Sequence, residues 1–203
     1  MVATPPDDYQ LLKNGKVELI RETEDNTDTL YASNTDGSVN ENKSITVNKG
    51  TLDNIENTTF FDPTLGENGK NVPIQIMDAS SSTNSQGLFE FMANNSTSEF
   101  SITNFENGKI LIGTSFEYDA ESSLNISWPK NGNIVSHDHS HPSWEEPSGA
   151  DSVFANTIKE AQPNTDPIFR IFTVPTQQYK TYDESGIQLQ GATIIIPKRK
   201  KQQ

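Results

Sequence analysis

All three histidines of this 203-residue chain lie between residues 137 and 141, and this cluster constrains the fold more than any other feature. An Asn-Gly turn and two β-branched residues before the cluster predict a strand from Asn133 to His139. Alternate residues of a strand point to the same face of a sheet. His139 and His141 would therefore share one face, where two neutral imidazoles can bind one cation.

The segment after the histidines predicts a third ligand. Ser148 is a good helix N-cap, and apolar residues at helical spacing after it predict a helix from about Gly149 to Ala161. Asp151 then lies in the first turn, where its carboxylate can complete the ligand set. Two histidines and one carboxylate leave a fourth tetrahedral position for water, which is the layout of a catalytic zinc site. Ser148 and Asp151 are also an ordinary capping pattern, and only their combination with the histidines favours a metal site.

The spacing of these residues resembles a family motif. The JAMM (JAB1/MPN/Mov34) zinc metallopeptidases carry His-x-His-Pro followed by Ser-x-x-Asp, and the chain is similar at His139-Ser-His-Pro and at Ser148-Gly-Ala-Asp. The resemblance implies that zinc held by His139, His141 and Asp151 activates a water to hydrolyse an amide or isopeptide bond. It also implies that Ser148 donates a hydrogen bond to the tetrahedral oxyanion. The loop from Trp144 to Pro147 is shorter than in the eukaryotic members, which affects the rim that faces the substrate.

A catalytic water also needs a general base. In the JAMM family this base is a glutamate at the start of an early strand, directly after the first helix. The chain has a predicted helix over Gly87–Asn95 and then a predicted strand over Glu99–Asn104, so the resemblance implies that Glu99 takes the proton and passes it to the leaving amine. Glu90 is the alternative, but its position within the helix favours a solvated surface carboxylate. His137 lies outside the motif, and we expect it to sit behind the ligands or to face solvent.

Residue counts exclude several other hydrolase types. Without cysteine, the chain cannot be a thiol protease and cannot form a disulfide or a zinc knuckle. It lacks the His-Glu-x-x-His motif of zincins and the further histidines of amidohydrolase sites. A metal-dependent nuclease remains an alternative, but a net charge of -13 repels phosphate and the only dense basic cluster is Lys198–Lys201. We therefore expect no nucleic-acid partner, and, without an apolar run of about 18 residues, no membrane partner.

Residue patterns divide the chain into three predicted parts. Residues 1–73 are expected to form an N-terminal β-rich extension and linker, 74–197 a JAMM-like metallopeptidase core, and 198–203 a basic tail. The extension opens with a predicted β-meander over Tyr9–Ser33, and residues 51–85 have the composition of a linker or irregular connection. Further strands are predicted over Lys109–Phe116, Ile168–Val174, near Tyr179 and over Gly191–Ile196. The expected class is α+β: a mixed sheet flanked by helices in three layers (α/β/α), with a JAB1/MPN-like core.

The chain is also similar to the JAB-like toxin domains at the C-termini of Rhs-type polymorphic toxins of Bacteroidetes. The similar segments are Pro5-Pro-Asp-Asp-Tyr9, the Leu-Phe-Glu-Phe helix before Glu99, and the Ser-Gly-Ala-Asp turn. This resemblance implies a module of a longer bacterial chain that is secreted or delivered into a target cell, without a signal peptide of its own. Its partners would be a protein substrate and a cognate immunity protein. A catalytically silent JAMM-fold binding module is the alternative from another class.

Overall fold

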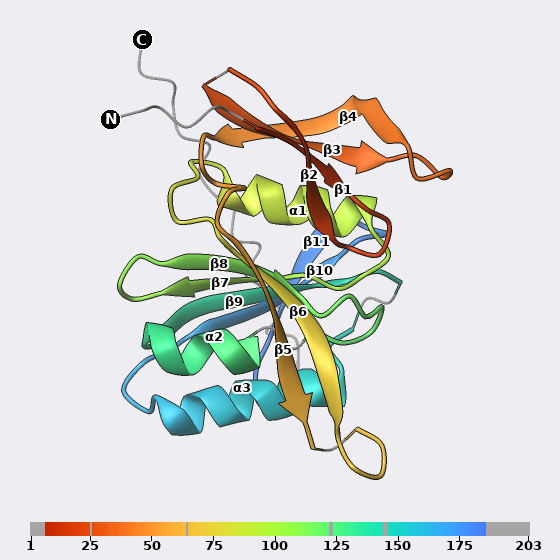
Figure 1. The fold of residues 1–203 in the computed structure, drawn as a ribbon. Coiled ribbons are helices and arrows are strands. Elements are labelled where there is room, and N and C mark those ends of the chain that lie inside the picture. The colour runs from red at the N-terminus through yellow and green to blue at the C-terminus, as the bar shows by residue number, and fades with distance from the viewer. Residues whose placement is uncertain (1–6, 25, 64, 122–123, 144–145, 186–203) are drawn as a thin grey trace.

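Figure 1 shows the fold as a computed structural model, which describes residues 7–185 apart from 25, 64, 122–123 and 144–145. This part of the chain forms a four-stranded sheet, a seven-stranded sheet and three helices. The combination of helices with mixed sheets confirms the predicted α+β class. No helix within it is long and apolar enough to cross a membrane. The strand predicted over Gly191–Ile196 and the basic tail lie outside the described residues.

The smaller sheet has the strand order β2-β1-β3-β4. Its strands are β1 (Asp7–Leu11), β2 (Val17–Glu22), β3 (Thr27–Ser33) and β4 (Val39–Asn48). The predicted β-meander is wrong in its pairing, because β3 lies parallel to β1 and not beside β2. Residues 8–11 of β1 are buried and need a neighbour on both edges, whereas β2 exposes every residue except Val17. β2 therefore stays at the edge of the sheet.

The larger sheet has the strand order β11-β10-β9-β7-β8-β6-β5. Its strands are β5 (Ile55–Asp62), β6 (Lys70–Asp78), β7 (Ser101–Phe105), β8 (Ile110–Thr114), β9 (Ile134–His141), β10 (Ile168–Thr173) and β11 (Gln178–Tyr182). β9 and β10 run parallel, and the other neighbours run antiparallel. β9, which carries the histidines, lies between β7 and β10 in the interior of the sheet.

Residues 51–85 do not form the predicted linker. They include β5 and β6, which pair as a hairpin and extend the larger sheet. Pro63, Gly66 and Gly69, which suggested an irregular connection, lie in the turn between these two strands. The predicted boundary at residue 73 falls inside β6, whose side chains at Val72 and Ile74 are buried.

The helices pack on both faces of the larger sheet (Figure 1). α1 (Ser85–Asn95) lies between the two sheets, and α2 (Leu124–Asn131) and α3 (Gly149–Ala161) lie on the opposite face. Two apolar clusters result, because each face of the larger sheet buries its own side chains. The first joins the smaller sheet, α1 and the larger sheet, through residues that include Leu11, Leu30, Val47, Leu88, Phe89, Met92, Ile102 and Phe172. The second joins α2 and α3 to the larger sheet, through residues that include Leu124, Ile134, Ala155, Ile158, Phe169 and Ile171.

α2 was not among the predicted elements. It is a short helix of eight residues, and so short a segment gives little room for a helical repeat of apolar residues. The helix predicted over Gly149–Ala161 has the same bounds in the structure. The difference follows from the signals that each segment carries, because α3 has a clear N-cap and an amphipathic repeat.

Candidate metal centre

β9 presents its three histidines on one face of the larger sheet. His137, His139 and His141 alternate with Asp138, whose side chain points to the other face, and all four are buried. On that other face, Asp138 accepts hydrogen bonds from Arg170 of β10, from Nε at 2.7 Å and from Nη2 at 2.6 Å. Pairing with β7 and β10 along both edges fixes the backbone of β9. The imidazoles therefore project from a rigid support.

Asp151 reaches the histidines from the first turn of α3. The Ser148 Oγ accepts a hydrogen bond from the Asp151 N–H at 3.2 Å, and the Asp151 Oδ2 accepts one from the Ser148 N–H at 2.5 Å. This reciprocal pair is a capping box. The other carboxylate oxygen, Oδ1, lies 3.0 Å from the His139 Nε2. Helix capping and approach to the histidines are thus compatible, because the cap orients the same carboxylate.

His139, His141 and Asp151 form a compact group of candidate ligand atoms. The two Nε2 atoms are 3.0 Å apart, and the Asp151 oxygens lie 3.0 Å from His139 and 3.6 Å from His141. Ligands that bind zinc tetrahedrally at about 2.0–2.1 Å are separated from one another by roughly 3.3 Å, which is close to these distances. Within the described residues no other group of histidine, cysteine or acidic side chains has such an arrangement. The group could bind one metal ion.

The protonation states of the group also suit a cation. Burial lowers the pKa of His141 to about 4, with His139 as a second cause. Burial acts to raise the pKa of Asp151, but the hydrogen bond and charge of His139, together with the hydrogen bonds from Ser148, outweigh it and lower the pKa to about 2. At neutral pH, His141 is therefore a neutral imidazole and Asp151 a carboxylate, the forms in which these side chains bind metals.

Glu99 is held close to this group by its backbone. Its N–H donates to the carbonyl of Glu117 and its carbonyl accepts from the Thr114 Oγ1, both at 2.8 Å. These partners are the last residue of β8 and a residue after it. β7 begins only at Ser101, so Glu99 lies before that strand and does not open it as predicted. Its side chain is buried, and its Oε1 has no hydrogen-bond partner among the described residues. Burial raises the pKa of Glu99 to about 9, and the charge of Asp151 contributes.

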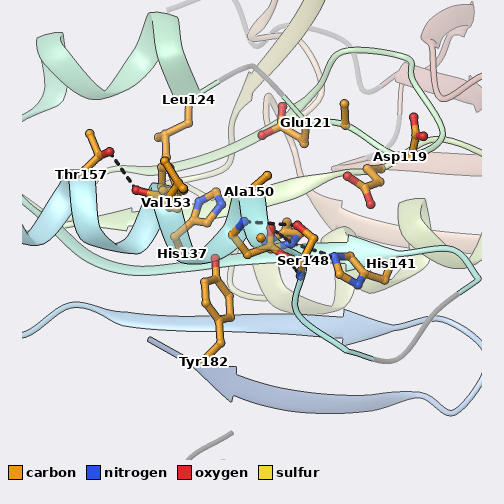
Figure 2. Close-up of a pocket in the computed structure, with 16 residues that line it drawn as sticks. Asp119, Glu121, Leu124, His137, His141, Ser148, Ala150, Val153, Thr157 and Tyr182 are labelled. Atoms are coloured by element: carbon orange, nitrogen blue, oxygen red, sulfur yellow. Dashed lines mark hydrogen bonds and ion pairs between the residues drawn. The ribbon is translucent and has the colours of Figure 1, made fainter. Parts of the chain in front are cut away.

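A cavity of about 630 Å³ connects these residues (Figure 2). It is lined by Glu99, Ser148 and the three candidate ligands, so the residues that the sequence singled out meet in one place. Glu90, the alternative base, lies on α1 and accepts a hydrogen bond from the Tyr179 hydroxyl at 2.9 Å. It does not line the cavity. Only one of the two glutamates can therefore reach a substrate in this cavity.

No sequence motif marks the other polar residues of the cavity. Asp119 and Glu121 line it from the segment between β8 and α2, and Tyr182 lines it from β11. Their side chains reach the site through pairing and loop geometry that has no local sequence signal. Burial raises the pKa of Tyr182 well above its ordinary value, so its hydroxyl keeps its proton. The short loop from Trp144 to Pro147, which was predicted to affect the rim that faces the substrate, includes residues 144–145, which lie outside the described residues.

His137 is buried in the wall of the cavity and does not face solvent. Its Nδ1 lies 2.9 Å from the Thr103 Oγ1 on β7, and its ring centroid lies 4.8 Å from that of Phe154 on α3. The ring centroids of His137 and His139 are 5.8 Å apart. Burial lowers the pKa of His137 to about 3, with His139 as a further cause. His137 is thus a neutral side chain next to the ligand group.

Comparison with known proteins places the chain in a family. No curated protein and no solved structure matches it. Residues 77–188, which are more than half of the chain, match the model of a family described as JAB-like toxin 1. The matched range includes every strand of the larger sheet from β7 to β11, all three helices and the candidate metal group. The chain therefore belongs to the JAB-like toxin 1 family.

Proposed function

We propose that the chain is a toxin module that hydrolyses an amide or isopeptide bond in a protein, with zinc held by His139, His141 and Asp151. The observation that carries this proposal is the meeting of the ligand group with the buried carboxylate of Glu99 in one cavity. Membership of a JAB-like toxin family supports the toxin role. Helices on both faces of the larger sheet support a three-layer, JAB1/MPN-like core.

The donor set fits zinc. Two imidazole nitrogens and one carboxylate are common ligands of catalytic zinc, which keeps a further position for water or substrate. When bound, zinc supplies Lewis-acid activation that makes water a nucleophile near neutral pH. The buried Asp138 on the far face of β9 accepts two hydrogen bonds from Arg170. This ion pair holds the strand that carries both histidines.

Glu99 serves as the general base in this proposal. Its buried side chain lines the cavity, and its Oε1 has no hydrogen-bond partner among the described residues, so it is available to a reacting group. A carboxylate in this place accepts a proton from the attacking water and returns it to the leaving amine. In the metal-free chain burial raises the pKa of Glu99 to about 9, and the positive charge of a bound metal ion would lower this pKa toward the carboxylate form that acts as a base.

Ser148 is proposed to stabilise the oxyanion. Its Oγ accepts the hydrogen bond from the Asp151 N–H, so its own O–H remains able to donate into the cavity. A donor aimed at the developing charge of a tetrahedral intermediate accelerates acyl transfer. Capping and donation use different parts of the same hydroxyl group, and Ser148 can perform both.

Cavity charge favours a protein substrate over a nucleic acid. The described residues that line the cavity include the carboxylates of Glu99, Asp119, Glu121 and Asp151 and no lysine or arginine. A phosphodiester would be repelled by such a site, because nucleic-acid binding depends on basic contacts to phosphate. A neutral amide carries no such penalty.

The biological setting is part of the same proposal. As a JAB-like toxin, the module would be secreted or delivered into a target cell within a longer bacterial chain of the Rhs polymorphic-toxin type. The producing cell would need an immunity protein, and the cavity opening would be a suitable place for it to bind. A protein substrate inside the target cell completes the set of partners.

The test compares Glu99→Gln with Glu90→Gln on a proteome lysate. We expect the wild type and Glu90→Gln to generate the same new protein termini or released isopeptide-linked chains, as measured by terminal-labelling mass spectrometry. Glu99→Gln should bind zinc and produce none, because an amide cannot accept the proton. An active Glu99→Gln protein would overturn the assignment of the base, and a wild type that cuts no protein in zinc would argue against the proposed reaction.

A further inference from the structure

Tyr182 places an unused hydroxyl beside the metal group. The side chain is 2% exposed and its hydroxyl has no hydrogen-bond partner among the described residues. Its ring packs edge-on against His139 with centroids 5.8 Å apart, and at a tilt against Phe169 with centroids 5.7 Å apart. A buried hydroxyl without a partner costs stability, so its retention here calls for a ligand that satisfies it.

His137 offers a second polar atom in the same wall. Its Nδ1 is hydrogen-bonded with the Thr103 Oγ1, and this is the one hydrogen bond of its side chain to a described residue. The Nε2 is thus left for another group, as an acceptor or a donor according to the tautomer. Figure 2 shows Tyr182 extending from β11 toward His137. Both residues line the cavity, and neither belongs to the candidate ligand group.

The wall around these two atoms is largely apolar. Leu124, Val153, Phe154 and Thr157 line the cavity. The Phe154 ring packs against His137, and the Thr157 hydroxyl donates to the Val153 carbonyl at 2.8 Å. Figure 2 shows Leu124 and Val153 near His137, whereas Asp119 lies at the far end near His141. We propose that Tyr182 and His137 form a subsite that binds one uncharged amide group of the substrate, next to the metal group. Its role in a reaction rests on the proposed hydrolytic function, but binding to it does not.

The chemistry of the subsite suits an amide and disfavours an anion. The Tyr182 hydroxyl can donate to a carbonyl oxygen, while the His137 Nε2 can pair with the amide N–H in its acceptor tautomer. An anion would meet the charge of Asp151, whose side chain is only 13% exposed, and its repulsion is weakly screened there.

Two parts of a protein substrate carry such a group. One is the side-chain amide of an asparagine or glutamine near the scissile bond, which would make the subsite a determinant of specificity. The other is the backbone peptide next to the scissile one, which would make it a device for positioning any sequence. The two differ in substitution at nitrogen, because a side-chain amide is primary and a backbone amide is secondary.

Binding of small amides to the full chain as purified tests the subsite. Benzamide represents the primary amide, N-methylbenzamide the secondary amide, and benzoate the anion of similar shape. Affinities are measured by NMR titration in the wild type and in Tyr182→Phe, His137→Asn and Tyr179→Phe. Tyr179→Phe is the matched control, because it removes a hydroxyl from the same strand that bonds to Glu90 instead of facing the cavity. Asparagine at 137 retains a polar atom near Thr103 and lacks the reach of Nε2.

We expect saturable binding of an amide, with benzoate weaker. Tyr182→Phe and His137→Asn should each weaken amide binding by about 3 to 10-fold, and Tyr179→Phe should leave it unchanged. Tighter binding of benzamide supports the side-chain source, and equal or tighter binding of N-methylbenzamide supports the backbone source. Absence of saturation, tighter binding of benzoate, or wild-type affinity in a folded Tyr182→Phe protein would overturn the subsite. A chain that binds amides through Tyr182 and cuts no protein would refute only the proposed hydrolysis.

Discussion

Asp151 contacts the helix cap and the candidate metal group with one carboxylate. Its Oδ2 accepts from the Ser148 N–H and its Oδ1 faces the His139 Nε2. Each contact restricts the rotation of the side chain, so the carboxylate is already oriented before any ion binds. Sequence spacing was sufficient to indicate this residue, because a capping box and a His-x-His pair are both local patterns.

Zinc content tests the ligand assignment. We expect one zinc per chain in the wild type, and its loss in His139→Ala, His141→Ala and Asp151→Ala, because two remaining ligands hold the ion poorly. His137→Ala should retain most of the zinc, since His137 is outside the group. Elemental analysis of the purified proteins gives the answer. Full zinc in the His141→Ala protein would contradict the assignment.

Glu99 makes the stability of the metal-free protein depend on pH. The pKa of Glu99 is raised from 4.5 to about 9 in the folded chain, so folding favours the protonated form. This stabilisation is fully present below pH 4.5 and is lost as the pH rises toward 9. Glu99→Gln stays neutral at every pH. At pH 8 the metal-free Glu99→Gln protein should therefore have a free energy of unfolding roughly 1 to 3 kcal/mol higher than that of the wild type, as measured by urea unfolding. This difference in stability should disappear near pH 5. If the difference in stability instead grew as the pH was lowered, folding would favour the charged form of Glu99, and the prediction would be wrong.

Elements with their own local signals were predictable, and elements that depend on distant partners were not. α3 and β9 carry a cap, an amphipathic repeat and a turn next to them, and both were predicted within a few residues. The segment of β5 and β6 was predicted to be a linker because the turn between them is rich in glycine and proline. These strands form by pairing with each other and with β8, and this pairing has no signal in the local sequence. The parallel partnership of β1 and β3 likewise joins residues far apart in sequence.

Ser148, at the N-terminus of α3, has two proposed roles that one substitution can distinguish: helix capping and stabilisation of the oxyanion. As a cap alone, Ser148→Ala would lower stability by about 0.5 to 2 kcal/mol and leave turnover of the folded protein intact. As an oxyanion donor, Ser148→Ala should also lower the catalytic rate by about 100-fold or more. Both quantities are measurable on one preparation, by urea unfolding and by initial rates.

Ser148→Asp is the control for this element. Aspartate is an equally good N-cap, but its charge would oppose a developing oxyanion. We expect a folded, zinc-loaded and inactive Ser148→Asp protein. Turnover at the wild-type rate would make Ser148 a structural residue only.

At the scale of the whole molecule, the smaller sheet contacts the segment that carries Glu99. The turn between β1 and β2 contacts the segment before Glu99: the Thr97 N–H donates to the Lys13 carbonyl and the Ser98 Oγ donates to the Asn14 carbonyl, both at 2.8 Å. Gly15 has a φ of +85°, and a Cβ there would lie 3.0 Å from the Ser98 Cβ. The segment that carries Glu99 is thus packed against residues far outside the range that matches the family, 77–188.

This packing leads to a prediction about the proposed division of the chain at residue 73. The smaller sheet contributes Leu11, Leu30 and Val47 to the apolar cluster that also contains Leu88 and Met92 of α1. Exposing each such side chain costs about 1.5 to 3 kcal/mol, and a domain has a net stability of only about 5 to 15 kcal/mol. A chain that begins at residue 54, before β5, should therefore lose cooperative thermal unfolding and zinc binding, although it retains every candidate ligand. Calorimetry and elemental analysis of this truncated chain check the prediction. Cooperative unfolding with one zinc per chain would show that the larger sheet and its helices fold alone, and that the smaller sheet is an independent extension.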